Sequence, residues 1–200
     1  MDRIDELASA FTRFPGIGPR QGKRFVYHLL TVPREERARL AELITKLADD
    51  VHQCPECMRY FNGTSAHVCN YCTDGRRDDS LLMLVEKDQD LASVERAGTY
   101  KGRYFILGGV LTLSGKGAIR ERELVRAVER RLEKGLSEIV LALSATSEGE
   151  HTADRIRELL SPLRDKVRIT VLGRGLATGS ELEYSDAETV RAALSNRHDA

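Results

Sequence analysis

The apolar residues of the N-terminal quarter recur with the period of an α-helix. They predict a first helix over residues 4–11, and the run Phe-Pro-Gly-Ile-Gly-Pro at 14–19 then predicts a tight turn. A second helix carries apolar positions at 25–30 and ends before Pro33, and a third spans 35–47. The pattern therefore indicates a small helical segment built around a hairpin.

Beyond residue 80 the pattern changes to short apolar runs that alternate with amphipathic segments. The runs predicted to be strands are residues 81–85, 104–107, 139–143 and 167–172. The segments predicted to be helices are residues 124–132, 152–163 and 187–194. Alternation of this kind predicts a mostly parallel sheet covered by helices.

Between these regions lies a cysteine-containing segment with few large aliphatic residues, which could not form a core of its own. The sequence thus predicts a multidomain α+β chain with four parts. These are a helical domain at 1–52, a cysteine module at 53–79, an α/β domain at 80–175 and a C-terminal extension at 176–200.

All four cysteines fall into two Cys-x2-Cys pairs, Cys54 with Cys57 and Cys69 with Cys72. Two such pairs supply four thiolates, which suit a tetrahedral Zn2+ ion and leave no open position for catalysis. We therefore predict one structural zinc ion per chain. His67 is an alternative ligand, although a histidine at such a position is more often an exposed side chain.

The turn between the first two helices is a candidate phosphate-binding site. Its glycines allow close approach of a phosphate, and the next helix begins with free N–H groups. No Asp or Glu occurs from residue 7 to residue 34. An ordinary helix corner is the alternative interpretation. The predicted DNA-binding residues are Gly16, Gly18, Arg20, Lys23 and Arg24.

Two predicted strands end in polar residues at the edge where open α/β sheets place their sites. Glu86 follows the strand 81–85, and the strand 139–143 leads into a segment with Glu148 and Glu150. This region resembles the Toprim fold, in which a glutamate joins an Asp-x-Asp pair to bind Mg2+. Ser144 and Thr146 stand at the aspartate positions, and hydroxyls are poor ligands for a hard cation.

The order of these motifs over nearly the whole chain resembles the RecR family of bacterial recombination mediators. Further matching motifs are Arg76-Arg77-Asp78, Tyr100-x-Gly102-x-Tyr104 and the segment 179–186. The resemblance implies a helix-hairpin-helix domain, a four-cysteine zinc finger and a degenerate Toprim domain. It also implies a clamp without enzymatic activity that forms a ring tetramer and works with RecO and RecF to load RecA on gapped DNA.

The resemblance also assigns roles to individual residues. Arg20 and Arg24 match basic positions that face DNA, and the acids Glu86, Glu148 and Glu150 match positions that contribute to partner contact. The chain departs from the family in having eleven residues between its cysteine pairs, 58–68, and in having Gly22 where alanine is common. A glycine there is expected to weaken its helix by about 1 kcal/mol.

The composition of the chain excludes some classes of protein. The chain has 31 basic and 31 acidic residues among 200, which argues against a protein that simply coats nucleic acid. It has no apolar stretch long enough to span a membrane, and its acidic start is unlike a signal peptide. These features predict a cytoplasmic protein. The alternatives are an active Mg2+-dependent Toprim enzyme and a free-standing zinc-containing DNA-binding module.

Overall fold

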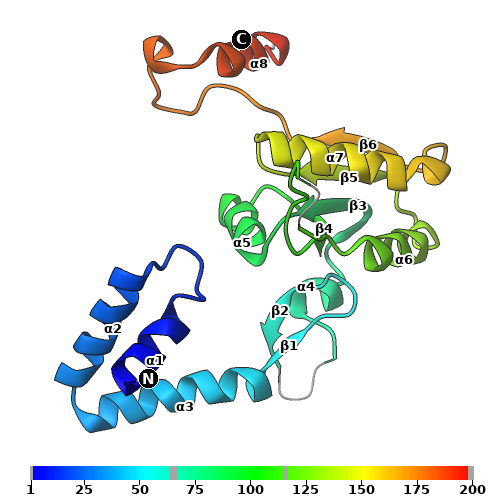
Figure 1. The fold of residues 1–200 in the computed structure, drawn as a ribbon. Helices are drawn as coiled ribbons and strands as arrows, with labels where there is room; N and C mark the ends of the chain where they lie inside the picture. The colour runs from blue at the N-terminus through cyan, green and yellow to red at the C-terminus, as the bar shows by residue number, and fades with distance from the viewer. Residues whose placement is uncertain (1, 64–66, 115–116, 198–200) are drawn as a thin grey trace. The chain divides into compact units, whose positions relative to one another are not determined.

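The computed structural model of the chain describes residues 2–63, 67–114 and 117–197. It divides into two compact units, residues 1–52 and residues 53–200, which are described separately below. Figure 1 shows the helices and strands of each. Within the described residues, no helix is both long and apolar enough to cross a membrane.

The N-terminal unit consists of the helices α1 (Arg3–Phe11), α2 (Pro19–Thr31) and α3 (Arg34–Asp50). Helices α1 and α2 pack closely, since a Cβ atom added to Gly22 would lie 2.7 Å from the Ala8 carbonyl oxygen. Gly22 therefore lets the two backbones approach each other, which the sequence did not reveal. The predicted helical hairpin is confirmed.

The cysteine module contains the short strands β1 (Val51–Gln53) and β2 (Tyr60–Asn62), which form a two-stranded sheet, and the single-turn helix α4 (Asn70–Thr73). Its buried cluster comprises Cys54, Cys57 and Cys69 together with Phe61. Three of these four side chains are cysteines, so the module has little apolar surface with which to fold by itself.

The α/β region is built on a four-stranded parallel sheet in the order β4-β3-β5-β6. Strand β3 (Asp78–Val85) is central, with β4 (Gly102–Ile106) on one side and β5 (Glu138–Ala142) on the other. Strand β6 (Arg168–Val171) pairs with β5 and forms an edge. The four predicted strands and their parallel arrangement are confirmed.

The two faces of the sheet have separate cores. Leu82, Leu84 and Phe105 pack with the apolar sides of α6 (Glu121–Leu132) and α7 (Ser147–Leu159) on one face. On the other face, Met83 and Val85 pack with residues of α5 (Asp88–Ala97). The alternation of inward side chains along β3 thus divides the core between the two layers of helices.

Several helices differ from the sequence prediction. The single-turn α4 was not predicted, and α6 begins at Glu121 rather than Leu124. Helix α5 was not predicted, and its apolar contacts come mainly from Leu91 and Val94. Helix α7 begins at Ser147 rather than Thr152, because the Thr146 hydroxyl accepts the Gly149 N–H and caps the helix. It ends at Leu159, and the rest of the predicted span forms the 3-10 turn η1 (Ser161–Leu163).

The C-terminal segment contains the 3-10 turn η2 (Leu182–Tyr184) and the helix α8 (Ala187–Ser195). Asp186 caps α8 by accepting the N–H groups of Glu188 and Thr189, both at 2.9 Å. The predicted C-terminal helix is confirmed. Several large apolar side chains of this segment are exposed, Tyr184 most of all at 79%.

Candidate metal centre and nucleic-acid interface

The four cysteines converge on one point. Their sulfur atoms all lie within 4.8 Å of one another, and three of the four residues are buried while Cys72 is half-buried. The Cys57 and Cys69 sulfurs are 3.5 Å apart, and the Cys69 N–H donates to the Cys54 sulfur at 3.5 Å. Four sulfurs this close suit a tetrahedral ion with bonds of about 2.3 Å. The donor set therefore fits a metal site, and Zn2+ is the ion that such a set favours.

Without a bound cation, the four clustered thiols compete for protons. Hydrogen bonds with the other cysteines, and then burial, raise the pKa of the Cys57 thiol, whereas hydrogen bonds from Cys57, Cys69 and Cys72 lower the pKa of Cys54. A buried group of this kind cannot hold four negative charges without compensation. A divalent cation provides that compensation.

The knuckle around Cys54 and Cys57 is joined to the sheet through main-chain groups. The Ile106 N–H donates to the Cys57 carbonyl at 2.8 Å, at the end of β4. The Arg120 guanidinium, just before α6, donates to the carbonyls of Ile106 at 2.9 Å and Met58 at 3.3 Å. Met58 itself has a positive φ of 62°, which turns the chain after the second cysteine.

The second knuckle is held by Arg103 of β4, a buried arginine. Its guanidinium donates to the carbonyls of Tyr71 and Cys72 at 2.9 and 3.0 Å. It also forms an ion pair with Asp79 at 2.7 Å. The cysteine module is thus hydrogen-bonded to the α/β region at both of its metal-binding turns.

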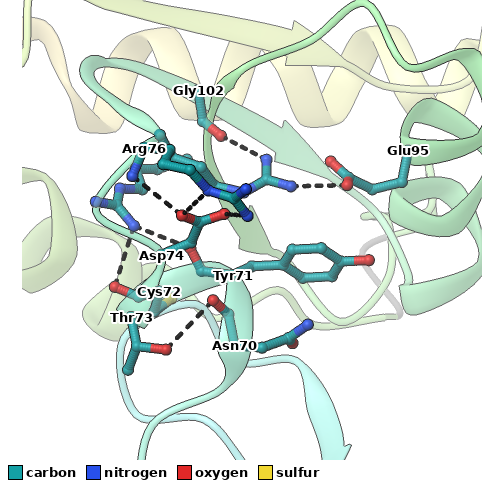
Figure 2. A network of polar contacts seen from close by, with 10 residues as sticks. Asn70, Tyr71, Cys72, Thr73, Asp74, Arg76, Glu95 and Gly102 are labelled. Carbon is teal, nitrogen blue, oxygen red and sulfur yellow. Dashed lines mark hydrogen bonds and ion pairs between the residues drawn. The ribbon is translucent and has the colours of Figure 1, made fainter.

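A second arginine, Arg77, joins the module to helix α5. It donates to the Gly102 carbonyl at 3.0 Å and to the Glu95 carboxylate at 2.7 Å, and it stacks on the Tyr71 ring at 4.6 Å. Figure 2 shows Tyr71 extending across the space between Asn70 and Glu95. The Tyr104 hydroxyl donates to Glu95 as well, at 2.5 Å.

The predicted DNA-binding hairpin is open to solvent at its glycines. Gly16 has a φ of +77°, and Gly18 occupies the N-cap of α2, with no atom within 4 Å of a Cβ at either position. Pro19 starts the helix, so its missing N–H costs nothing there. Arg20 and Arg24 are exposed on the first turns of α2.

Lys23, the third basic residue of the hairpin helix, already has a partner. Its ammonium group lies 2.9 Å from the carboxylate of Asp5 on α1. This ion pair raises the pKa of Lys23 through a hydrogen bond and charge attraction. Asp5 precedes the acid-free window of residues 7–34, so inspection of that window could not identify it.

The sheet edge brings Glu86 and Ser144 together, as their positions after β3 and β5 predict. The buried Glu86 carboxylate accepts the Ser144 N–H at 2.7 Å. The Ser144 and Thr146 hydroxyls are 3.1 Å apart, and the second of them caps α7. Both hydroxyls therefore have partners within the protein.

The two other acids of this edge differ in their surroundings. Glu148 is half-buried in the first turn of α7, where its charge is favoured by the helix dipole. Glu150 forms an ion pair with Arg174, which lies between β6 and the C-terminal segment. A cavity of about 250 Å3 adjoins the edge and is lined by Glu86, Asp90 and Ser144 among others.

Comparison with known sequences agrees with this arrangement. The RecR helix-hairpin-helix family matches residues 4–48, the Toprim domain family matches 80–173, and the RecR C-terminal family matches 175–198. The recombination protein RecR of Myxococcus xanthus is 38% identical over 99% of this chain and 98% of its own length. That of Methylocella silvestris is 40% identical over 98% and 95%, and that of Cutibacterium acnes is 36% identical over 97% and 94%.

A helical hairpin, a four-cysteine centre and a Toprim domain in this order define a class of proteins that act in DNA recombination. Within that class, the chain belongs to the RecR family. The resemblance noted from the sequence motifs is thereby confirmed.

Sequence reasoning did not identify the arginines that hold the cysteine module in place. Arg103 and Arg120 gave no periodic signal, and Arg77 was part of a matched motif without a role. One signal was present, since Arg103 opens the otherwise apolar run 103–107 within a buried strand. A charged residue in such a run requires partners nearby.

Proposed function

We propose that this protein is a non-enzymatic DNA-binding clamp in recombinational repair, which acts in the cytoplasm with RecO and RecF to help load RecA on gapped DNA. The observation that carries the proposal is the hairpin of the N-terminal unit. Its glycines are open to solvent, and two exposed arginines follow them on α2.

The hairpin suits phosphate rather than bases. The first N–H groups of α2 have no acceptors within the helix, and Gly16 and Gly18 leave room for a phosphate oxygen to approach. Arg20 and Arg24 add positive charge, while Lys23 contributes only when it leaves Asp5. Phosphate contacts of this kind bind DNA of any sequence, and their affinity falls as the salt concentration rises.

The cysteine cluster is proposed to hold one structural Zn2+ through Cys54, Cys57, Cys69 and Cys72. When bound, the ion supplies a cross-link between two turns that lack an apolar core. Because both turns are hydrogen-bonded to β4, the cross-link also supports the α/β region.

The Toprim region is proposed to lack catalytic activity. Two-metal phosphoryl transfer needs several carboxylates around the ions. Here the Asp-x-Asp positions are Ser144 and Thr146, and Glu86 accepts a main-chain N–H with one oxygen. Glu86, Glu148 and Glu150 are proposed instead as contacts for a partner protein. Glu150 would exchange Arg174 for a basic group of that partner.

A ring tetramer is the proposed assembly, and exposed apolar surfaces support self-association. On α3, Leu43, Ile44 and Leu47 lie on one side of the helix and are each more than half exposed. Leu182 and Tyr184 are exposed in the C-terminal segment as well. Apolar surface of this extent is typical of residues that become buried in an oligomer.

The proposal is tested by DNA binding measured over a range of salt concentrations. We expect Arg20→Ala with Arg24→Ala to weaken binding to all sequences about equally and to reduce the slope of log K against log salt by about 2. The matched control is Arg34→Ala with Arg39→Ala, which removes two exposed arginines from α3 and should change binding much less. Equal affinity of the hairpin variant and the parent would refute the role of the hairpin.

Two further measurements separate the clamp from the alternatives. The mass in solution should be that of a tetramer, whereas a free-standing DNA-binding module would be a monomer. Incubation with Mg2+ and nucleic acid should give neither cleavage nor synthesis. Cleavage that disappears in Glu86→Gln would instead establish an active Toprim enzyme.

A further inference from the structure

Helix α6 places an arginine where its pattern calls for an apolar residue. Leu124, Ala127 and Val128 form the buried stripe of the helix, and Arg131 occupies the next position of the same stripe. The Arg131 residue is only 4% exposed. An arginine buried to this degree normally has an acidic partner.

No such partner exists among the described residues. The Arg131 Nε has no hydrogen-bond acceptor, and no carboxylate there forms an ion pair with this guanidinium. The terminal nitrogens of the guanidinium are not among the buried unpaired atoms, and Arg131 lines a cavity. Arg131 therefore lacks a carboxylate partner in the described part of the chain and is available to a negative group at that cavity.

The surroundings of Arg131 indicate where that group is. Arg131 lines a cavity of about 260 Å3 together with Cys72, the least buried of the four cysteines. Two acids, Glu56 and Asp79, line the same cavity, but each is paired with another arginine. Asp79 is 2.7 Å from Arg103, and Glu56 is 3.8 Å from Arg130.

We propose that Arg131 is a positioning residue of the metal centre and that its guanidinium neutralises the charge of the metal-bound cysteine thiolates. This inference rests on the proposal that the cluster holds Zn2+. Four thiolates around one Zn2+ form a doubly negative centre, and cations beside such a centre stabilise it. Arg131 comes from the α/β region, so the Toprim domain itself helps to retain the metal.

An anion such as phosphate is the other group that could occupy the cavity. Arg103 and Lys134 also line the cavity. Arg103, however, already forms an ion pair with Asp79 and donates to the carbonyls of Tyr71 and Cys72. The metal centre and the two acids would both repel an incoming anion. The charge balance therefore favours the thiolates as the partner of Arg131.

The test measures how fast zinc passes from the full-length, zinc-loaded protein to a chromogenic chelator. In Arg131→Met, which keeps an unbranched apolar stem and removes the guanidinium and its charge, we expect transfer to be about 10-fold faster or more. Arg131→Lys should stay within about 3-fold of the parent, because it keeps the positive charge. Arg126→Met, which removes an exposed arginine of α6 that does not line this cavity, should match the parent.

Val128→Ala distinguishes the role of charge from a loss of packing. It removes two methyl groups from the same buried stripe of α6 and lowers stability without changing any charge. Faster zinc transfer in Arg131→Met but not in Val128→Ala is the expected result. If zinc transfer is equally fast in both variants, Arg131 acts only through packing, and the inference is overturned.

Two other outcomes also overturn it, and they can be told apart. If purified parent protein contains no zinc, the zinc proposal itself fails. If zinc is present and Arg131→Met releases it at the parental rate, only the role of Arg131 fails. In that case, a rise in the melting temperature with inorganic phosphate that is absent in Arg131→Met would identify the cavity as an anion site.

Discussion

The two units of the molecule hold themselves together in different ways. Among the described residues of 1–52, only Ala8, Gly22 and Val26 are buried, and no residue of α3 is. The described part of residues 53–200 contains two apolar cores, a cysteine cluster and the buried Arg103, which is hydrogen-bonded and ion-paired.

This difference separates two ways of stabilising a fold. The N-terminal unit depends on close backbone packing and leaves many of its large apolar side chains exposed. The C-terminal unit depends on buried contacts and on polar links between the cysteine module and the sheet. Substitutions in the N-terminal unit should therefore change helix packing or DNA binding. Substitutions in the C-terminal unit should change metal content or the polar links to the sheet.

The largest effect is expected from Cys57→Ala. A structural zinc site in a small module contributes on the order of 10 kcal/mol to folding, which is comparable to the whole stability of a domain. We expect this variant to lose its zinc and to aggregate, as measured by metal analysis and circular dichroism. His67→Ala is the control and should keep one zinc per chain. A stable, zinc-free Cys57→Ala protein would show that the sheet does not need the metal.

Gly22→Ala tests the packing of the N-terminal unit. The new Cβ would lie 2.7 Å from the Ala8 carbonyl oxygen, so α1 and α2 must move apart. We expect this displacement to lower the free energy of unfolding by about 1–3 kcal/mol. That loss exceeds the gain of about 1 kcal/mol in helix propensity. His28→Ala, at an exposed site of α2, serves as the control in urea unfolding. An increase in stability would instead mean that the helices adjust freely.

Glu95→Gln tests the polar links of the C-terminal unit. Burial raises the pKa of Glu95, but hydrogen bonds from Arg77 and Tyr104 outweigh this, and the pKa lies below its ordinary value. The carboxylate therefore stabilises the fold above the unfolded pKa of about 4.3, and this contribution is lost as pH falls through the lower folded value.

We expect Glu95→Gln to cost about 1–3 kcal/mol at pH 7 and progressively less below pH ~4. Chemical unfolding at several pH values measures the difference. Glu158→Gln, at an exposed ion pair with Arg155, is the control and should change little at any pH. If Glu95→Gln lowers the free energy of unfolding by the same amount at every pH, the charge of Glu95 is not responsible.

The smallest effect is expected from Asp5→Asn, and it concerns binding rather than stability. The substitution frees Lys23 from its ion pair with Asp5. We expect tighter DNA binding at low salt and an increase of about 1 in the salt slope. Glu6→Gln, in the same turn of α1, is the control. If Asp5→Asn and Glu6→Gln have the same DNA affinity and the same salt slope, Lys23 does not contact DNA.

Much of the architecture could be predicted from the sequence because local patterns determine it. The hairpin between α1 and α2 follows from its prolines and glycines, and the strands β3, β4 and β5 each contain a continuous apolar run. The cysteine cluster follows from spacing alone. The sequence also placed Glu86 and Ser144 at the same edge, where they are hydrogen-bonded.

What could not be predicted depends on contacts between distant residues. Arg103 binds carbonyls at Tyr71 and Cys72, and Lys23 pairs with Asp5 across two helices. Gly22 was interpreted as a weak helix position, yet its lack of a side chain permits the approach to Ala8. Helix α5 was missed because few of its residues face the core.

The position of the cysteine module in the chain has a consequence for the order of folding during synthesis. All four cysteines leave the ribosome before Arg103, Ile106 and Arg120, the residues that later hold their turns. The loop between the cysteine pairs is short, so closing it costs little entropy, whereas the parallel sheet must wait for strands far along the chain. We therefore expect the nascent chain to acquire its metal first, and β4 to assemble against a module that is already closed.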